Sequence, residues 1–431
     1  MTKGKNKRFW VALVLFGLIG QIAWVVENMY FNVFIYNMFS ASAKDISLMV
    51  AASSVIATLT TILIGALSDK LGRRRLFLSV GYILWGISIL LFALVRRDVL
   101  GALFPTAVSV SAIGVTVTVI LDCLMTFFGS SANDAAFNAW LTDETEHRER
   151  GRVEGVNAMM PLVAILAVFG GFMSFDLKLA SSWTVIFLII GVIVLISGIL
   201  GIFLIEEPKR ERAQERYLET LLYSFRPRTV KANPRLYLSL LAFAVFGISI
   251  QIFMPYLIIY YEVSLGMTDY VFVMAPAIIL ASVATVFYGR TYDKWGFVRS
   301  ALPAIGILAV GYIILILTKS TLPVFIGSLF MMTGYLSGMA VFGAVIRERI
   351  PTGKAGAFQG VRIVGQVLIP GLVGPVIGAW VLRNAKTMLG TDGTTSFIPN
   401  ANIFIAALAV AALAAGAVLL TQVPSRRNRK V

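Results

Sequence analysis

Acidic residues lie inside segments that are otherwise long and apolar, and they are the first candidates for chemistry. Glu27 lies in the middle of the apolar segment 9–39, while Asp122 and Asp134 lie within 106–140. A carboxylate inside a lipid bilayer costs several kcal/mol unless it faces a water-filled cavity or a partner. Binding of a cation neutralises that charge. These acids are therefore candidates for holding a coupling ion, either H⁺ or Na⁺.

Polar side chains recur around these acids at the spacing of one helix face. Such a stripe on a membrane-spanning helix indicates a water-filled cavity; the alternative is a hydrogen-bond network that only joins neighbouring helices. Arg362 and Gln366 extend the set to the segment 358–381, although Arg362 could instead reach a lipid phosphate. The predicted substrate- and cation-binding residues are Gln21, Trp24, Glu27, Asn28, Asn32, Asp122, Asp134, Asn138, Arg362 and Gln366.

The identity of the coupling ion stays open at this point. A proton needs one carboxyl group, whereas Na⁺ needs several oxygens arranged around it. The apolar segment 46–68 contains no acidic residue, and this absence favours H⁺. Asp134 could alternatively be hydrated near a helix end, and Asp122 could be a structural partner of a polar neighbour.

Motifs for metal binding and enzymatic catalysis are missing from the sequence. The chain has one Cys and one His, which excludes a disulfide framework, a multi-Cys zinc site and two-His metal motifs. It contains no HExxH, GxSxG or Walker A pattern. The sequence therefore predicts no metal, no cofactor and no enzymatic activity.

The composition indicates a polytopic membrane protein. Hydrophobic residues make up 58% of the 431 residues and charged residues only 14%, against about 25% charged in a soluble protein. Apolar runs of about 20 residues, the length that crosses a ~30 Å hydrocarbon core, recur along the chain and predict about twelve helices. We expect an all-α membrane fold with spans at 9–39, 46–68, 76–95, 106–140, 155–175, 182–205, 236–261, 270–289, 298–318, 321–346, 358–381 and 399–422.

Basic residues gather in alternate loops. Most of the 37 Lys and Arg residues lie on the side that carries both termini, which the positive-inside rule assigns to the cytoplasm. The net charge of +15 is explained by this bias, so nucleic-acid binding is not expected. We expect a monomer in the lipid bilayer of the cell membrane.

Two copies of one motif divide the chain into halves. Gly65 to Gly72 and Gly289 to Gly296 both fit G-x-x-x-D-K-x-G, and each copy follows the second span of its half. Further pairs, at Gly151 and Gly356 and at Pro208 and Pro424, keep the same order. We therefore predict two parallel six-helix repeats. The predicted domains are 1–205 and 236–431, joined by a cytoplasmic linker 206–235 in which Leu218, Leu221, Leu222 and Phe225 indicate a short interfacial helix.

The segment from Gly65 to Arg75 resembles the signature loop between helices two and three of the major facilitator superfamily. That resemblance covers the whole chain and implies two pseudo-symmetric six-helix bundles that work by alternating access. Within the superfamily, Asn133 to Asp143 resembles the end of helix four in melibiose-permease-like glycoside–cation symporters and in sucrose–proton symporters.

The resemblance also implies a cytoplasmic gate. In the family, the Asp of this motif contacts the N-terminus of helix eleven and a following Arg pairs with an acid below helix four. Carried over, Asp69 meets the helix that starts near Gly356, and Arg73 pairs with Asp143 or Glu144. The alternative is that the basic residues serve only as topology signals. The predicted gating residues are Gly65, Asp69, Gly72, Arg73, Asp143, Gly289, Asp293 and Gly296.

These observations together predict a secondary active transporter. The solute expected is small and polar, with a sugar or glycoside as the leading hypothesis, and its movement is coupled to a proton or sodium gradient. One alternative is a proton-coupled exporter of drugs or metabolites, since direction is not encoded in the motifs. An alternative of another class is a membrane sensor or receptor that transports nothing.

Overall fold

A computed structural model describes residues 7–145, 149–206, 222–351, 355–389 and 394–422. Apart from one two-stranded sheet, the regular elements in these residues are helices. The all-α membrane fold predicted from the sequence is confirmed.

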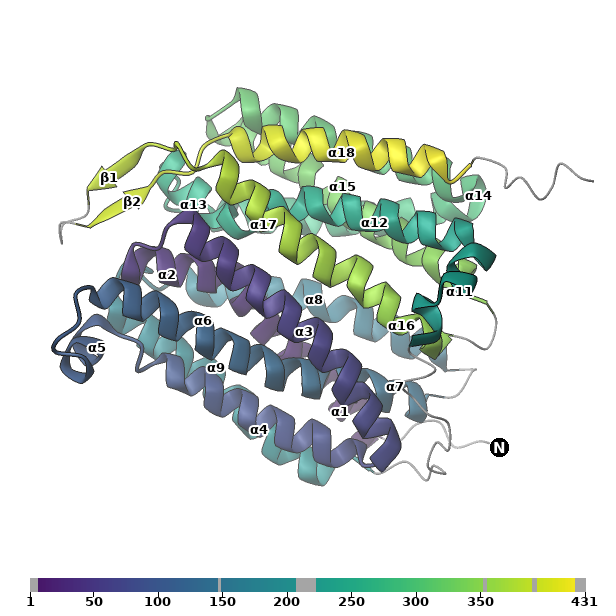
Figure 1. Cartoon of the computed structure of the whole chain (residues 1–431), viewed down its shortest axis with the longest axis horizontal. Coiled ribbons are helices and arrows are strands. Elements are labelled where there is room, and N and C mark those ends of the chain that lie inside the picture. The colour runs from purple at the N-terminus through teal and green to yellow at the C-terminus, as the bar shows by residue number, and fades with distance from the viewer. Residues whose placement is uncertain (1–6, 146–148, 207–221, 352–354, 390–393, 423–431) are drawn as a thin grey trace, which may run out of the picture. The chain divides into compact units, whose positions relative to one another are not determined.

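The chain forms two compact units (Figure 1). Unit 1 comprises Met1–Glu215 with Met388–Ser396, and unit 2 comprises Arg216–Thr387 with Phe397–Val431. The finer domain and linker boundaries given above stay predictions. Of the predicted interfacial helix, Leu218 and Leu221 lie outside the described residues, while Phe225 lies in a 3₁₀ turn.

Unit 1 contains the first six predicted spans. Its first helix is continuous from Lys7 to Phe39 but includes a π-helical turn, and the helix that follows the third span includes a second one. The elements are α1 (Lys7–Val25), η1 (Val26–Tyr30), α2 (Phe31–Phe39), α3 (Ala43–Leu71), α4 (Arg74–Phe92), α5 (Arg97–Leu103), α6 (Val110–Gly129), η2 (Ser130–Phe137), α7 (Asn138–Glu144), α8 (Arg150–Phe172) and α9 (Ala180–Leu204).

Unit 2 contains the remaining spans, and the division between the units crosses both strands of the sheet. The helices of unit 2 are η3 (Tyr223–Phe225), α11 (Pro227–Ala232), α12 (Pro234–Phe253), η4 (Met254–Tyr256), α13 (Leu257–Ile259), η5 (Tyr260–Ser264), α14 (Val271–Leu317), α15 (Thr321–Arg349), α16 (Ala355–Ile363), η6 (Val364–Leu368), α17 (Ile369–Val381) and α18 (Asn402–Leu420), and the two strands are β1 (Thr387–Leu389) and β2 (Thr395–Phe397).

Eleven helices in the described part of the chain are long and apolar enough to cross a membrane. One of them, α14, has 47 residues and is interrupted at Gly296, whose backbone is not helical. At 1.5 Å per residue a helix of this length is about 70 Å long, enough for two crossings of a ~30 Å core. The spans predicted at 270–289 and 298–318 are the two arms of α14, so the expected number of about twelve spans agrees with the structure.

Aromatic side chains fill the core of unit 1 beside the first span. The ring centroids of Phe31 and Phe92 lie 4.5 Å apart, and those of Phe34 and Phe187 lie 5.1 Å apart. Both pairs are fully or almost fully buried and join α2 to α4 and α9. These contacts fix the part of the first span that immediately follows Glu27.

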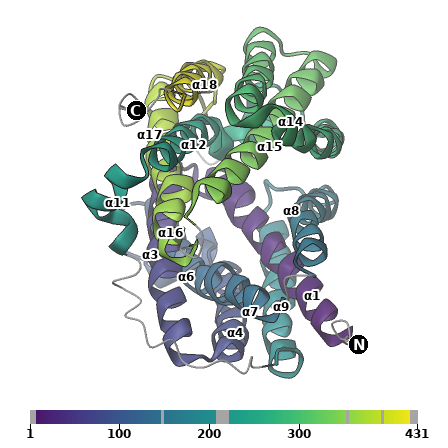
Figure 2. The ribbon, with the colours of Figure 1, turned by 90° about the vertical axis from the view of Figure 1, so that its right-hand side faces the viewer.

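Glycines let helices pack closely in both units. A Cβ atom at Gly86 of α4 would overlap the backbone of Leu195 in α9, and one at Gly334 of α15 would overlap Leu308 in α14. Because lipid provides no hydrophobic force between helices, close van der Waals packing at small residues holds such pairs together. Figure 2 shows α14 and α15 side by side within unit 2.

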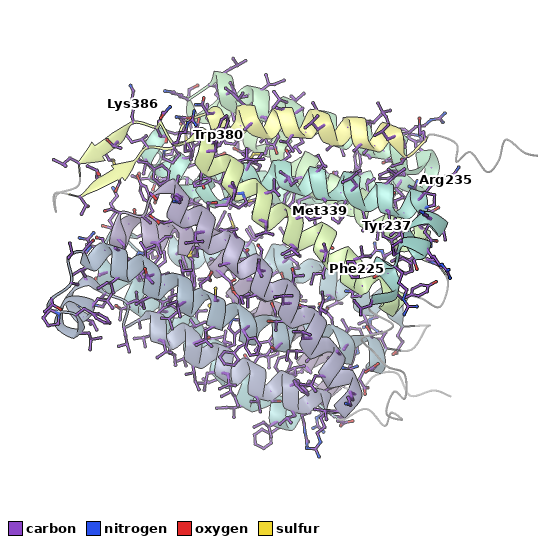
Figure 3. The ribbon with its side chains drawn as sticks, in the orientation of Figure 1. Phe225, Arg235, Tyr237, Met339, Trp380 and Lys386 are labelled. Carbon is purple, nitrogen blue, oxygen red and sulfur yellow. The ribbon has the colours of Figure 1, made fainter. Side chains whose placement is uncertain are left out.

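Aromatic and basic residues mark both ends of unit 2. Phe225, Arg235 and Tyr237 lie at one end, and Trp380 and Lys386 lie at the other (Figure 3). At the first end, the Tyr237 hydroxyl donates a hydrogen bond to the carbonyl of Ser224 and so ties α12 to η3. Such residues are typical of membrane–water interfaces.

The last glycine of each motif copy has a positive φ angle. Gly72 ends α3 with φ 64° and ψ 22°, and its N–H donates to the carbonyl of Ser68 at 2.9 Å. Gly296 has φ 74° and ψ −178° at the break in α14. L-residues rarely adopt either conformation. Glycine is therefore required at equivalent places in the two halves, which supports the internal repeat.

The different ψ angles at these glycines predict different tolerance of substitution. Asn accepts the left-handed helical region, so Gly72→Asn is expected to be more stable than Gly72→Ala. At Gly296 both Ala and Asn are expected to cost about 1–3 kcal/mol, because that region is essentially restricted to glycine. Gly155→Ala, at an open helical position, is the control and is expected to be neutral or stabilising. Thermal unfolding in detergent measures all five variants; a Gly296→Asn variant as stable as the parent would contradict the assignment.

Candidate site for a cation and a solute

Glu27 lies inside unit 1, on the π-helical turn η1 of the first span. Its side chain is 7% exposed. The Thr126 hydroxyl donates a hydrogen bond to Glu27 Oε1 at 2.8 Å, whereas Oε2 is buried with no hydrogen-bond partner. A π turn adds a residue to the helix and is common at functional sites. Glu27 thus presents one carboxylate oxygen that is free to bind a cation.

Asp122 lies on α6, one helical turn before the threonine that binds Glu27. It is 1% exposed, and its Oδ1 atom is buried with no hydrogen-bond partner. Ser53 of α3 lies next to this carboxyl group. Ser53 is one of several hydroxyl residues in the segment 46–68, so its position next to Asp122 has no distinguishing signal in the sequence.

The two carboxyl groups have no countercharge. Within the described residues, neither Glu27 nor Asp122 forms an ion pair with Lys or Arg. The buried polar residues of unit 2, by contrast, are all Ser or Thr in the part of the chain that the structure describes. The buried carboxyl groups therefore belong to unit 1, where they can neutralise their charge only by taking up a cation.

Asp134 has a different environment. It lies on η2, is half-buried, and accepts a hydrogen bond from the Ser130 hydroxyl at 3.0 Å. Asn138, one turn later, and Asn28 on η1 are exposed. Asn28, Asn138 and Asp134 are thus more accessible than Glu27, which is almost fully buried; contact of these side chains with a solute stays a prediction.

The predicted asparagines use their amide N–H groups within their own helices. Asn28 Nδ2 donates to the carbonyl of Trp24 at 2.8 Å, and Asn32 Nδ2 donates to the carbonyl of Asn28 at 3.0 Å. Asn138 Nδ2 donates to the carbonyl of Asp134 at 3.1 Å. These bonds satisfy backbone carbonyls beside the π turns. A role for these residues in solute binding stays a prediction and would use their remaining oxygen atoms.

Asn133, which the candidate set did not include, is the centre of a buried network. Its Oδ1 accepts from Trp24 Nε1 at 3.3 Å, and its Nδ2 donates to the Tyr82 hydroxyl at 2.7 Å. The Tyr82 hydroxyl in turn donates to the carbonyl of Phe16 at 2.7 Å. This network matches the alternative weighed for the polar stripe, namely hydrogen bonds that join helices. It holds the Trp24 ring in place, while Gln21 lies half-buried one turn before.

The remaining predicted binding residues lie in unit 2. Arg362 is in the last turn of α16 and Gln366 is on η6, and both are half-buried. Their shared cavity with the acids of unit 1 stays a prediction.

The motif arginine that pairs with the acid below the fourth span is Arg74, so the prediction of Arg73 was wrong by one residue. Arg74 Nε lies 3.1 Å from Asp143 Oδ2, and Arg74 Nη1 donates to the Ser68 hydroxyl. Arg73 precedes α4 with a non-helical backbone (φ −112°, ψ 66°), and its side chain is exposed. The side chain of the first helical residue is directed back towards the preceding turn, which brings Arg74 to Ser68.

The copy of the motif in unit 2 makes a different contact. The Tyr292 hydroxyl donates to Glu348 Oε2, which joins the first arm of α14 to the end of α15. Gly289 is helical and Asp293 is exposed on the same helix. Gly65 is likewise helical, and the Asp69 side chain lies outside what the structure describes. The gating role of both aspartates stays a prediction.

The burial of the Arg74–Asp143 pair predicts a large effect of breaking it. Their side chains are 4% and 13% exposed, and removing one partner of a buried pair costs about 3–5 kcal/mol. We expect Arg74→Gln to lower the thermal stability strongly and Arg73→Gln, the matched control, to change it little. Adding Asp143→Asn to Arg74→Gln should restore part of the loss. Equal effects of the two single substitutions, measured by thermal unfolding, would refute the reassignment.

Comparisons with known proteins identify the family. The family model described as "Major Facilitator Superfamily" matches residues 9–375. A bacterial homologue of the human lysosomal transporter Spinster, in an inward-facing and unoccupied conformation, is 16% identical with a TM-score of 0.67, and the match covers 97% of this chain and 98% of that one. The nucleoside transporter NupG, as a mutant, is 11% identical with a TM-score of 0.72, covering 97% and 100%. At these identities the structural likeness shows the fold.

A search of curated proteins returned no significant match. The comparisons do not support the narrower resemblance to melibiose- or sucrose-type symporters. The family match covers unit 1 and most of unit 2, and the structural matches cover nearly the whole chain. The chain therefore belongs to the major facilitator superfamily of secondary transporters.

Proposed function

We propose that the protein moves a small polar solute across the membrane and that a cation bound at Glu27 and Asp122 drives this movement. The observation that carries the proposal is the pair of buried carboxylate oxygens, Glu27 Oε2 and Asp122 Oδ1, that have no hydrogen-bond partner and no countercharge among the described residues. An unoccupied charged form is costly inside the bilayer, and cation binding removes the cost.

The chemistry of the site favours H⁺ over Na⁺. A proton needs a single carboxylate oxygen, and one is free on each acid. Each acid has one hydroxyl neighbour among its printed contacts, Thr126 for Glu27 and Ser53 for Asp122.

Coupling follows from the energy of the charged form. With the carboxylate ionised, closing the helices around Glu27 would isolate a charge from water. With the proton bound, the same movement carries only neutral groups, so the change of access becomes less costly. Cation binding thereby lowers the cost of the conformational change that moves the solute site from access on one side of the membrane to access on the other.

For the solute we propose a sugar or glycoside. Asn28 on η1 and Asn138 at the start of α7 are exposed, and Asp134 on η2 is half-buried. Their oxygen atoms are acceptors that suit the hydroxyl groups of a sugar. Nucleosides are N-glycosides and belong to the same chemical class, and NupG, which has this fold, is a nucleoside transporter. The solutes to test therefore include free sugars, O-glycosides and nucleosides.

Substitution of the proposed cation site should separate driven uptake from exchange. In proteoliposomes, Glu27→Gln is expected to abolish accumulation against the solute gradient, because the neutral amide cannot release a proton. Exchange of labelled for unlabelled solute should persist, since it needs no net proton movement. Asp98→Asn, an exposed acid paired with Arg96 outside the spans, is the control and should accumulate solute normally. Undiminished uphill uptake by Glu27→Gln would remove Glu27 from the mechanism.

The ion itself is tested by imposing the pH and Na⁺ gradients separately. We expect the parent protein to accumulate solute with a pH gradient alone. Accumulation driven only by Na⁺ would contradict the assignment of H⁺, and no driven uptake of any member of the panel would contradict the proposed solute class.

A further inference from the structure

An apolar groove runs along α1 on one side of unit 1. Its first part is a hollow of about 500 Å³ whose lining residues, among those that the structure describes, belong to α1, from Lys7 and Trp10 to Leu18 and Ile19. Its second part is a cavity of about 210 Å³ lined by Ile19 and Ile22 together with residues of α8 and α9. Because Ile19 lines both, the two hollows adjoin. Figure 2 shows α1 with α8 and α9 in this unit.

The second part of the groove owes its depth to a glycine. Gly171 of α8 lines the cavity, and no atom lies within 4 Å of the place where its Cβ would be. Ile190 and Val194 of α9 form the opposite wall. The adjacent Gly170 is equally open but does not line the cavity. A side chain at position 171 would therefore fill space that the structure leaves empty, whereas one at position 170 would not.

Two cations lie at the open end of the groove. Lys7 is exposed at the start of α1, and the Arg152 guanidinium of α8 lies 4.6 Å from the centre of the Trp10 ring. Neither cation pairs with a carboxylate among the described residues. Arg8 differs, because it binds Glu206 Oε1 at 2.8 Å and the carbonyl of Leu204. The groove thus has a basic end with a tryptophan, as expected at a membrane interface, and an apolar body.

The length of the groove matches one leaflet of a bilayer. From Lys7 to Ile22 the helix rises about 22 Å at 1.5 Å per residue. Half of a bilayer that is about 40–45 Å thick with its headgroups is about 20–22 Å. A molecule that fills the groove would therefore place its polar end at the cations and its hydrocarbon end near the middle of the membrane.

We propose that this groove binds one anionic glycerophospholipid. Its phosphate contacts Lys7 and Arg152, and one acyl chain lies along α1 and ends in the cavity beside Gly171. The charge of the headgroup complements the two cations, and basic sites at the ends of spanning helices bind anionic headgroups in this way. The positive-inside prediction places this end in the cytoplasmic leaflet, where anionic lipids are enriched.

Native mass spectrometry of the full-length protein can test the proposal with phosphatidylglycerol and phosphatidylcholine of identical chains. We expect the parent protein to retain phosphatidylglycerol about thirtyfold more strongly than phosphatidylcholine, the ratio expected for two basic contacts. Lys7→Gln combined with Arg152→Gln should remove this preference and leave the weaker retention of phosphatidylcholine. A preference that survives in the double variant would overturn the headgroup assignment.

A second, matched pair of variants tests whether the acyl chain ends in the cavity beside Gly171. Gly171→Leu should lower retention of both lipids, whereas Gly170→Leu should retain them as the parent does. Ile22→Trp fills the same cavity from α1 and takes the place of Gly171→Leu if that variant does not fold, as judged by size-exclusion chromatography. Equal retention by the position-171 and position-170 variants, or unchanged retention by Ile22→Trp, would overturn the proposed path of the chain. The outcome is independent of the proposed cation site.

Discussion

Charge burial without a countercharge is the constraint on which the structure of unit 1 depends. Glu27 and Asp122 are both almost fully buried, and the hydroxyl of Thr126 contacts one of the four carboxylate oxygens. A hydrogen bond from a neutral hydroxyl does not offset the cost of a buried charge. A helix bundle keeps such groups only if they are neutral for part of the time. The proposed reversible binding of a cation would supply that neutrality and would give the carboxyl groups a role that packing alone does not explain.

The surrounding helices keep these groups in place through apolar contacts and a separate polar network. Aromatic rings of α2 pack against α4 and α9, and Asn133 joins the first, third and fourth spans by hydrogen bonds to Trp24, Tyr82 and Phe16. Unit 2 has the same plan of spans, but the buried side chains that form its hydrogen bonds are hydroxyl groups, such as Ser249, which contacts the Tyr312 hydroxyl and the carbonyl of Ala407. The two halves thus share an architecture and differ in the chemistry that they bury.

Much of the fold could be predicted from the sequence, because bilayer thickness fixes the length of an apolar span and the motif copies mark equivalent positions. The glycines at 72 and 296 illustrate this, since the positive φ angles explain why both copies end in Gly. The details of the site could not be predicted in the same way. A π turn shifts the helical phase by one residue, so regular spacing does not show that Asn28 is exposed while Glu27 is buried. The ion pair with Asp143 was predicted for Arg73 but is formed by Arg74 for a similar reason, because the residue at which α4 starts decides which arginine faces Asp143.

The central claim is that the Glu27–Asp122 site holds a proton that can leave. Infrared difference spectroscopy of the protein in bilayers tests it without knowledge of the solute, by recording the carbonyl stretch of protonated carboxyl groups across the physiological pH range. We predict a protonated-carboxyl band that decreases as the pH rises and that is missing from Glu27→Gln combined with Asp122→Asn. A parent spectrum that shows only ionised carboxylates at every pH, or a band that persists unchanged in the double variant, would contradict the account.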